Sequence, residues 1–506
     1  MILAHRDYEQ SRRLDADVVV VGTGAGGAPV AAVLAEAGLD VLMVEEGGHH
    51  PTSSFNPYGR ESIARLVRDG GTTAIQGRPL IPFVEGRCVG GSTVINGGMS
   101  WRPPERVLHE WARLTGAPEL GPAGLEPYLD QVEHDTSVAH QLDLSLGDDN
   151  RLMAAGAERM GWRHDKNKRG QYLCVGCNNC VMGCPTGAKT SSLVTWFPRA
   201  QAAGARCATE LRIQRLLIEG GRCVGVAGLA VNPRTRRLDT PVEIRARATV
   251  IACGAVQTPH LLLRHRLGRQ SGQLGKNFLC HPNAKVLAFY PQEVRGWQGV
   301  SQWGQVREFR DEGILFAENM IPPSAVASLQ PVHGQALWEM MRRYNHMVLG
   351  GVLVEDSTTG RIRRGPLDMA VPSYQITPYD IRRFIIGVTH MARMHLENGA
   401  DRVLLPFSGR HFITSQDELC DLESVVARPD DLDLFTVHLM GTARMGTVPR
   451  ESVVNLDGEL WDLPGCHVSD ASLFPTAIGV NPQVTIMALA LRIAERLSER
   501  LLSARG

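Results

Sequence analysis

Residues 17–48 read DVVVVGTGAGGAPVAAVLAEAGLDVLMVEEGG, and this stretch predicts the fold of the N-terminal part of the chain. The β-branched run Val18–Val21 is typical of a strand buried on both faces, and Val41–Val44 is a second such run. The alanine-rich segment 28–37 between them favours a helix. A strand, a glycine turn, a helix and a strand make a βαβ unit. We therefore predict that the chain opens with a doubly wound α/β domain.

The glycine turn in this stretch has the spacing of a dinucleotide-binding fingerprint. Gly22 permits the tight turn after the strand, Gly24 lets the backbone approach a pyrophosphate, and Gly27 lets helix and strand pack closely. The phosphates would then lie at the positive end of the helix. Glu45 closes the second strand about 20 residues on, where an acidic side chain accepts hydrogen bonds from a ribose. The turn predicts a bound dinucleotide, but it does not distinguish FAD from NAD.

The composition is that of a globular protein large enough for two or three domain-sized cores. Of the 506 residues, 43% are hydrophobic and 21% are charged, and 53 Lys and Arg balance 53 Asp and Glu. This neutral balance gives no support for nucleic acid or an anionic membrane as a partner. No apolar run approaches the roughly 18 residues of a membrane span, and Asp15 and Asp17 interrupt the segment after Arg12 and Arg13. We expect no export signal, no integral membrane segment and a cytoplasmic protein.

The order of predicted elements suggests one domain interrupted by another. Residues 50–100 are rich in Gly and Pro and should form long loops, whereas residues 104–165 should be mostly helical. A helix is expected from near Pro378, and another at Val484–Leu502. Strands are expected at Leu211–Ile218, Cys223–Val231, Val242–Ile244 and Val250–Ala252, and as short alternating pieces over 286–376.

Further segments, in order along the chain, resemble the glucose–methanol–choline (GMC) oxidoreductases, a family of FAD enzymes acting mainly on alcohols. The resemblance is nearest its cholesterol oxidase and long-chain alcohol oxidase branch. Five ordered matches are far more specific than one. They are GRCVGGSTVING at 86–97, GAVQTP at 254–259, GKNF with His281-Pro282 from 275, HLMGT at 438–442 with Asp470-Ala471-Ser472, and GVNP at 479–482 with Thr485.

This resemblance implies a fold and a division of the chain. The fold is a Rossmann-like FAD-binding domain of the GMC type, with an inserted α+β substrate domain built on an antiparallel sheet. We expect the first part of the FAD domain at 14–285, including a helical and Cys-rich insertion at about 104–190. The substrate domain would follow at 286–434, and the FAD domain would close with 435–506. The substrate would lie between the two domains.

The resemblance also implies which residues bind FAD. Asn96 and Asp470 are candidates for hydrogen bonds to the flavin and its ribityl chain, and Ile213 would lie near the adenine. Some relatives attach FAD covalently through a histidine just before the loop asparagine; Ile95 stands there, so we expect non-covalent FAD. The expected cofactor-binding residues are Gly22, Gly24, Gly27, Glu45, Gly90, Gly91, Ser92, Asn96, Gly97, Ile213, Asp470, Ala471, Asn481, Pro482 and Thr485.

His438 and Asn481 occupy the positions that resemble the family's catalytic pair. Alcohol oxidation needs a base for the hydroxyl proton and a donor that stabilises the developing alkoxide. A neutral imidazole is a suitable base near pH 7, so His438 would take the proton while Asn481 holds the substrate oxygen. We interpret His281, His390 and His395 as structural.

Four of the eleven cysteines lie close together: Cys174, Cys177, Cys180 and Cys184. The spacing C-x₂-C-x₂-C-x₃-C-P matches the bacterial ferredoxin pattern for iron–sulfur ligation, so we expect a [4Fe–4S] or [3Fe–4S] cluster. It would relay electrons from flavin to a partner such as a cytochrome. Four buried thiols or a structural zinc site are the alternatives. The other seven are interpreted as small buried hydrophobes: Cys88, Cys207, Cys223, Cys253, Cys280, Cys420 and Cys466.

Several functions remain open on the sequence alone. The first is an FAD-dependent alcohol dehydrogenase, with an O₂-using oxidase without a cluster as its alternative. Some GMC relatives split cyanohydrins, and an NAD-dependent dehydrogenase would use only the N-terminal fingerprint. The inserted segment is apolar enough for a bulky hydrophobic alcohol, although such residues are more often core. They are Trp303, Phe316, Met320, Trp338, Met340, Met341 and Met347.

Overall fold

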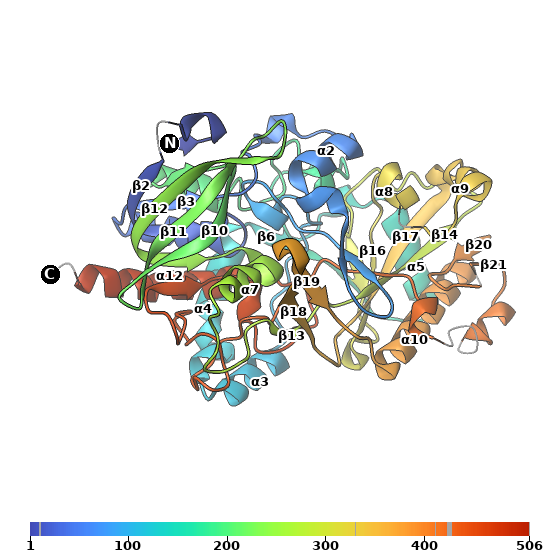
Figure 1. Ribbon diagram of the computed structural model, residues 1–506. Helices are drawn as coiled ribbons and strands as arrows, with labels where there is room; N and C mark the ends of the chain where they lie inside the picture. Colours follow the sequence, from blue (N-terminus) through green and yellow to red (C-terminus); the bar gives the residue numbers. More distant parts are fainter. Residues whose placement is uncertain (10–11, 329, 410, 423–427, 505–506) are drawn as a thin grey trace.

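The computed structural model describes residues 1–9, 12–328, 330–409, 411–422 and 428–504. Figure 1 shows two halves side by side, each built around one eight-stranded sheet, with both chain termini on the same half. Within these ranges, none of the helices combines the length and apolar character that a membrane crossing requires.

The sheet of the first half contains the βαβ unit predicted from residues 17–48. β2 (Arg13–Val21) pairs in parallel with β3 (Val41–Val44), and α1 (Gly27–Glu36) joins them, which confirms the prediction. The strand order is β1-β9-β3-β2-β12-β11-β10, with β23 beside β12. The other strands are β1 (Ile2–Leu3), β9 (Arg206–Ala208), β10 (Leu211–Glu219), β11 (Arg222–Val231), β12 (Leu238–Ile251) and β23 (Cys466–Val468).

The long strand β12 differs from the sequence prediction of two short strands. Its N-terminal half pairs antiparallel with β11, and its C-terminal half pairs in parallel with β23, while β2 runs parallel along both halves. Arg245 is exposed and Arg247 is half-buried, because this part of the sheet has one solvated face. The two arginines interrupt the apolar run without ending the strand.

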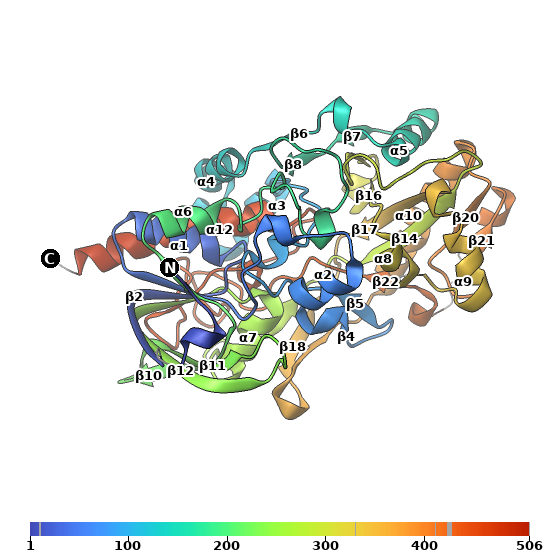
Figure 2. The same ribbon diagram turned by 90° about the horizontal axis from the view of Figure 1, so that it is seen from above.

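Helices cover the first sheet and join distant parts of the chain. Figure 2 shows α1, α6 (Trp196–Ala202) and α12 (Gln483–Ser503) lying together over the sheet. α12 packs on α1 and on α4 (Pro122–Asp135), so the last helix of the chain shares its core with the first. The remaining helices of this half are α2 (Gly59–Leu66), α3 (Glu105–Thr115) and α7 (Gly254–Arg264).

The sheet of the second half is antiparallel throughout, in the order β21-β20-β14-β17-β16-β15-β7, with β22 beside β14. Its first strand in the chain, β7, comes from the insertion predicted at about 104–190, so the second half does not follow chain order. The strands are β7 (His164–Lys166), β14 (Asn283–Phe289), β15 (Gly304–Val306), β16 (Ile314–Glu318), β17 (Met347–Val354), β20 (Arg402–Leu404), β21 (Phe412–Ile413) and β22 (Leu434–Phe435).

Each face of this sheet has its own core. α10 (Pro378–Glu397) packs on one face with α5 (Asp148–Arg159). The other face meets α8 (Pro323–Ser328) and α9 (Gly334–Met341) through an apolar cluster that includes Met320, Met340 and Met347. These methionines are therefore core residues, whereas the Trp338 side chain is exposed on α9.

Smaller sheets connect the halves and replace part of the predicted loops. β13 (Lys276–Phe278), β18 (Gly360–Arg364) and β19 (Ala370–Ser373) form an antiparallel sheet against α7, although the latter two strands belong by sequence to the second half. Within 50–100, where we expected loops, α2 and a two-stranded sheet are present. The paired strands are β4 (Thr73–Ile75) with β5 (Ile81–Phe83), and elsewhere β6 (Val138–His140) with β8 (Lys168–Gly170).

We predict that Gly26→Ala destabilises the fold. A Cβ on Gly26 would lie 1.7 Å from the carbonyl oxygen of Ser469, so the start of α1 or the segment after β23 must move. Such overpacking typically costs about 1–3 kcal/mol, occasionally more. Thermal unfolding of nucleotide-free protein measures the effect. Gly24→Ala is the matched control in the same turn, since its Cβ would lie 3.9 Å from the Cα of Gly91. Equal melting temperatures for the two variants would contradict the prediction.

Candidate active site

The glycine turn Gly22–Gly27 is packed against backbone on several sides. A Cβ on Gly22 would meet the Ala252 carbonyl oxygen at 2.2 Å, and one on Gly27 would meet the Gly22 carbonyl oxygen at 1.9 Å. Gly22 also has a φ of 106°, in the region that side chains avoid. Gly24 differs, because its Cβ would meet only the Cα of Gly91, at 3.9 Å, so there is space beside this residue at the start of α1. That space is where a nucleotide phosphate would bind.

Glu45 lies at the end of β3 beside the turn. Its carboxylate accepts hydrogen bonds from Thr23 Oγ1 at 2.7 Å and from the Gly47 amide at 3.0 Å. Burial raises the pKa of this carboxyl. A carboxylate has lone pairs for further donors, so these bonds leave room for a ribose hydroxyl. The Leu211 amide donates to the Glu45 carbonyl at 3.0 Å, which sets the strand carrying Ile213 beside it.

The loop Gly90–Gly97 lies against the first turn. The Gly90 amide donates to Thr23 Oγ1 at 3.1 Å, and the Cβ position of Gly91 is 3.0 Å from the Cα of Gly24. Ser92 Oγ accepts from the Gly86 amide at 3.0 Å and thereby closes the loop.

The end of this loop contacts both the second half and α12. The Cβ position of Gly97 is 1.9 Å from the Gln302 side-chain oxygen, so a larger residue would collide there. The Asn96 side-chain amide donates to Gln483 Oε1 at 2.6 Å, in the first turn of α12.

Asp470 holds together two turns of the first half. Its carboxylate accepts from the Gly254 amide at 2.9 Å, from Thr258 Oγ1 at 2.5 Å and from the Ser472 amide at 2.8 Å. The next residue, Ala471, accepts from the Gly441 amide at 3.0 Å through its carbonyl oxygen. These bonds tie the turn after β23 to the segment that carries His438.

His438 and Asn481 lie in contact, although 43 residues separate them. The Asn481 Nδ2 atom is 3.1 Å from His438 Nε2. Both residues are half-buried. Asn481 is followed by Pro482, the N-cap of α12, so the helix fixes its position. The pair can offer one substrate oxygen both a proton acceptor and an amide donor.

His281, which we interpreted as structural, lies beside this pair. Its ring centroid is 5.8 Å from that of His438, and its Nε2 is 3.3 Å from the Gly479 amide. Its φ of 39° is unusual for a residue with a side chain. The sequence signal was the motif GKNF with His281-Pro282, which we used as a match to the family and not as part of the catalytic site.

Lys285 on β14 is a second neighbour that sequence reasoning missed. Burial, His281 and Lys285 together lower the pKa of His438 to about 3, with burial the largest cause. Burial lowers the pKa of Lys285 itself to about 8. The imidazole of His438 is therefore neutral at physiological pH, as a general base requires.

Unpartnered polar atoms at this site fit a bound polar cofactor. In the part of the chain that the structure describes, Thr485 Oγ1 in α12, Ser472 Oγ and His438 Nδ1 are buried without a hydrogen-bond partner. Buried hydroxyls normally have one. Together with the glycine cradle at Gly24 and Gly91, they fit a long ligand running from the start of α1 to the start of α12. The residues present thus fit FAD.

The four clustered cysteines lie next to the same loop. Cys180 is buried, Cys174 and Cys184 are half-buried, and Cys177 is exposed. Among the described residues, no three His, Cys, Asp or Glu side chains are arranged to bind a single metal ion. A mononuclear zinc site at these cysteines therefore has no support from the geometry.

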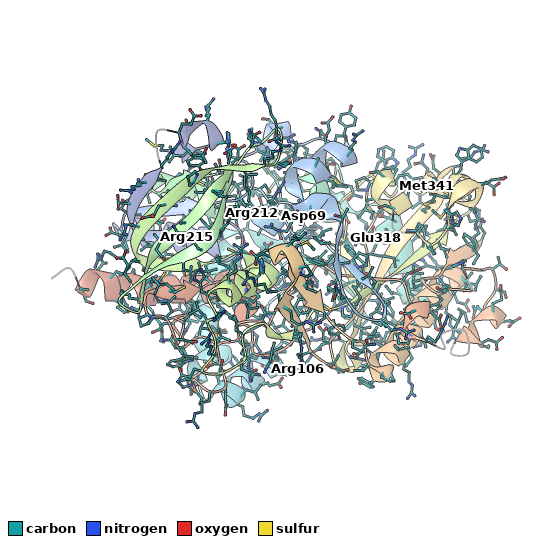
Figure 3. The ribbon with its side chains drawn as sticks, in the orientation of Figure 1. Asp69, Arg106, Arg212, Arg215, Glu318 and Met341 are labelled. Atoms are coloured by element: carbon teal, nitrogen blue, oxygen red, sulfur yellow. The ribbon has the colours of Figure 1, made fainter. Side chains whose placement is uncertain are left out.

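A hollow at the junction of the two halves reaches the segment before Asn481. Its lining includes Arg106, Leu353, Glu355 and Gly479. Arg106 on α3 pairs with Glu355, 2.5 Å away, across this junction. Figure 3 shows Arg106 between the halves, with Arg212 in the first and Glu318 in the second.

Comparison with known proteins agrees with this architecture. The chain matches the N-terminal GMC oxidoreductase domain over residues 63–283 and the C-terminal one over 356–490. An uncharacterized GMC-type oxidoreductase of Mycobacterium tuberculosis is 35% identical over 97% of this chain and 77% of its own length. One of Sinorhizobium fredii is 33% identical over 96% and 94%. A long-chain-alcohol oxidase of Arabidopsis thaliana is 28% identical over 99% and 69%.

Solved structures share the fold at low sequence identity. Pyridoxine 4-oxidase from Mesorbium loti superimposes with a TM-score of 0.72 at 18% identity, over 96% of this chain and 99% of that one. The two matched domains and the bacterial relatives show the family directly. The chain belongs to the glucose–methanol–choline oxidoreductases, flavoenzymes that bind FAD and oxidise alcohols.

Proposed function

We propose that this protein oxidises an alcohol to an aldehyde or ketone, with His438 as the base that accepts the hydroxyl proton. The contact between His438 and Asn481 carries the proposal. FAD, when bound, supplies the acceptor for the hydride that leaves the carbinol carbon. Asn481 holds the substrate oxygen through its amide, and His438, neutral because of its low pKa, takes the proton from that oxygen.

The remaining cofactor-binding residues hold FAD in this proposal. The Gly22–Gly27 turn binds the pyrophosphate, Glu45 accepts from the ribose, and the loop Gly90–Gly97 lies along the flavin. Thr485 lies in the first turn of α12, and Asn96 contacts Gln483 there, where the flavin end would reach the catalytic pair. Ile95 offers no nucleophile to the flavin, so FAD is held without a covalent bond.

The substrate binds at the junction of residues 286–434 with the FAD-binding parts 14–285 and 435–506. The relatives named long-chain-alcohol oxidases make aliphatic alcohols the first substrates to test, with sterols next. Bleaching of the flavin by an alcohol without oxygen separates this function from a cyanohydrin lyase, which uses no net redox step. The electrons then pass either to O₂ or to a protein such as a cytochrome.

We predict that His438→Ala slows flavin reduction by alcohol about 10²–10⁴-fold, the usual contribution of a general base. The flavin content should stay near the wild-type level, because the glycine turn and the loop Gly90–Gly97, which hold FAD in this proposal, are unchanged. Anaerobic stopped-flow absorbance measures both quantities. His134→Ala is the control, since that imidazole is 88% exposed on α4. An unchanged rate in His438→Ala would show that the base lies elsewhere.

The pH dependence follows from the same residue. His438 must be deprotonated to act, and its pKa of about 3 lies far below the usual value near 6.5. We therefore expect kcat/KM for the alcohol to stay level as the pH falls from about 7.5 to about 5. Lys285→Met removes a neighbouring positive charge, so it should raise the pKa of His438 and move the loss of activity to higher pH. A wild-type loss centred near 6.5 would contradict this assignment.

A further inference from the structure

Lys285 lies beside an open floor on one face of the second sheet. On β14 it pairs with Gly351 of β17, and Gly351 pairs with Ala317 of β16, so the three residues form one row across the sheet. Figure 1 shows these strands side by side. Paired residues point their side chains to the same face of a sheet. Because glycine and alanine are small, the face next to Lys285 is left open.

The next row on this face lines the hollow at the junction of the two halves. Asn283 pairs with Leu353, and Leu353 pairs with Leu315. Both leucines line the hollow, together with Gly479 in the segment that leads to the proposed catalytic pair. Residues two positions apart along a strand share a face, so the row of Lys285 looks toward the same space.

Two hydrogen-bond donors meet above Gly351. A Cβ on Gly351 would lie 3.1 Å from Lys285 Nζ, 3.1 Å from Asn283 Nδ2 and 3.0 Å from Asn283 Oδ1. Among the described residues, Asn283 Oδ1 is buried without a hydrogen-bond partner, although the side chain as a whole is half-buried. The amide nitrogen is therefore the polar atom of Asn283 that a ligand can reach. The ring of Phe435 lies 5.9 Å from Lys285 Nζ and closes one side of this space.

The Lys285 ammonium makes no ion pair with a carboxylate in the part of the chain that the structure describes. Burial lowers its pKa to about 8, and the charge of Glu318 acts in the opposite direction, so the amine is protonated at pH 7. The Glu318 carboxylate is engaged elsewhere, since it accepts from Asn150 Nδ2 at 2.5 Å and from the Gln302 amide at 3.0 Å. Buried charges are normally paired, because leaving water is costly for a lone ion. This cation therefore lacks an anion.

A ligand that suits these two donors supplies acceptor atoms and a negative charge. A carboxylate does both, because its two oxygens accept from an ammonium and an amide at once. A plain alkyl chain or a sterol ring would leave both donors without partners, which is unfavourable. A neutral hydroxyl group supplies an acceptor but no charge.

We propose that the alcohol substrate carries a carboxylate, which Lys285 Nζ and Asn283 Nδ2 bind while the proposed catalytic pair holds the hydroxyl. This inference rests on the proposed alcohol oxidation and narrows its substrates to hydroxy acids. The carboxylate itself is unchanged: hydride leaves the carbinol carbon for FAD, the hydroxyl proton goes to His438, and the product is an oxo acid. The alkyl part between the two ends lies against Leu315 and Leu353.

Paired substrates test this subsite in the wild-type holoenzyme. A hydroxyalkanoate and its methyl ester share the reacting hydroxyl and differ in the charge at the other end. At pH 7 the second-order rate constant for flavin reduction should be about 10–100-fold higher for the acid, the usual worth of a hydrogen bond to a charged group. Anaerobic stopped-flow absorbance over a series of chain lengths measures the ratio. A ratio near one at every length, or a neutral diol that reacts faster than the acids, would overturn the proposal.

Variants assign the preference to the cation. Lys285→Met should slow reduction by the acid about 10–100-fold and change the rate with the ester little, whereas Lys285→Arg keeps the charge and most of the preference. Lys166→Met is the matched control, because Lys166 is 44% exposed on β7 at the other end of the same sheet. If Lys285→Met slows acid and ester by the same factor, the charge acts on the flavin or on His438, and the carboxylate subsite is wrong.

A saturated alkanoate has no hydroxyl, so its binding reports on the subsite without turnover. Its dissociation constant, from competition with the hydroxy acid, should be at least about 10-fold weaker in Lys285→Met and also weaker in Gly351→Ala, whose Cβ displaces both donors. Equal constants in wild type and both variants would refute the subsite. If Lys285→Met takes up no FAD, Gly351→Ala and the wild-type ratio decide. A flavin-loaded wild type that no acid, ester or simple alcohol reduces would instead show that the proposed function fails.

Discussion

The structure depends on the close contact of three backbone segments around the Gly22–Gly27 turn. Gly26 touches the carbonyl of Ser469, and Gly22 touches that of Ala252, at distances that no side chain permits. These contacts join the first strand to β12 and to the segment after β23, which lie hundreds of residues away in the chain. Because the same segment carries Asp470, the packing that builds the first half also sets the position of His438.

Hydrogen bonds next to Asp470 hold the segments of the active site in place. The neighbouring Ala471 carbonyl binds the Gly441 amide, and α12 begins one residue after Pro482. His438 and Asn481 are thus each held from the first half, while His281 and Lys285 approach from the start of the second sheet. The pair is half-buried at this junction, where a substrate can enter between rigid elements.

The sequence predicted those helices and strands whose pattern lies within one short stretch of residues. The β-branched runs and the glycine spacing of 17–48 specify a βαβ unit, and the final helix follows from its apolar periodicity. β12 was predicted as two strands because Arg245 and Arg247 break its apolar run, although the strand pairing continues through them. His281 and Lys285 were missed for another reason: a buried histidine or lysine looks ordinary in sequence, and only tertiary packing shows what faces it.

Four basic side chains lie around the site. Lys285 and His281 lie beside His438, and Arg169 and Lys189 lie behind the loop that contains Asn96. Burial lowers the pKa of His281, so that imidazole adds no charge. The positive charges of Lys285, Arg169 and Lys189 favour negative charge nearby, as on an alcohol oxygen losing its proton. Burial is the largest cause of the low pKa of His438, and His281 and Lys285 add to it. Positive charge at this junction is therefore compatible with the neutral imidazole that the proposed base requires.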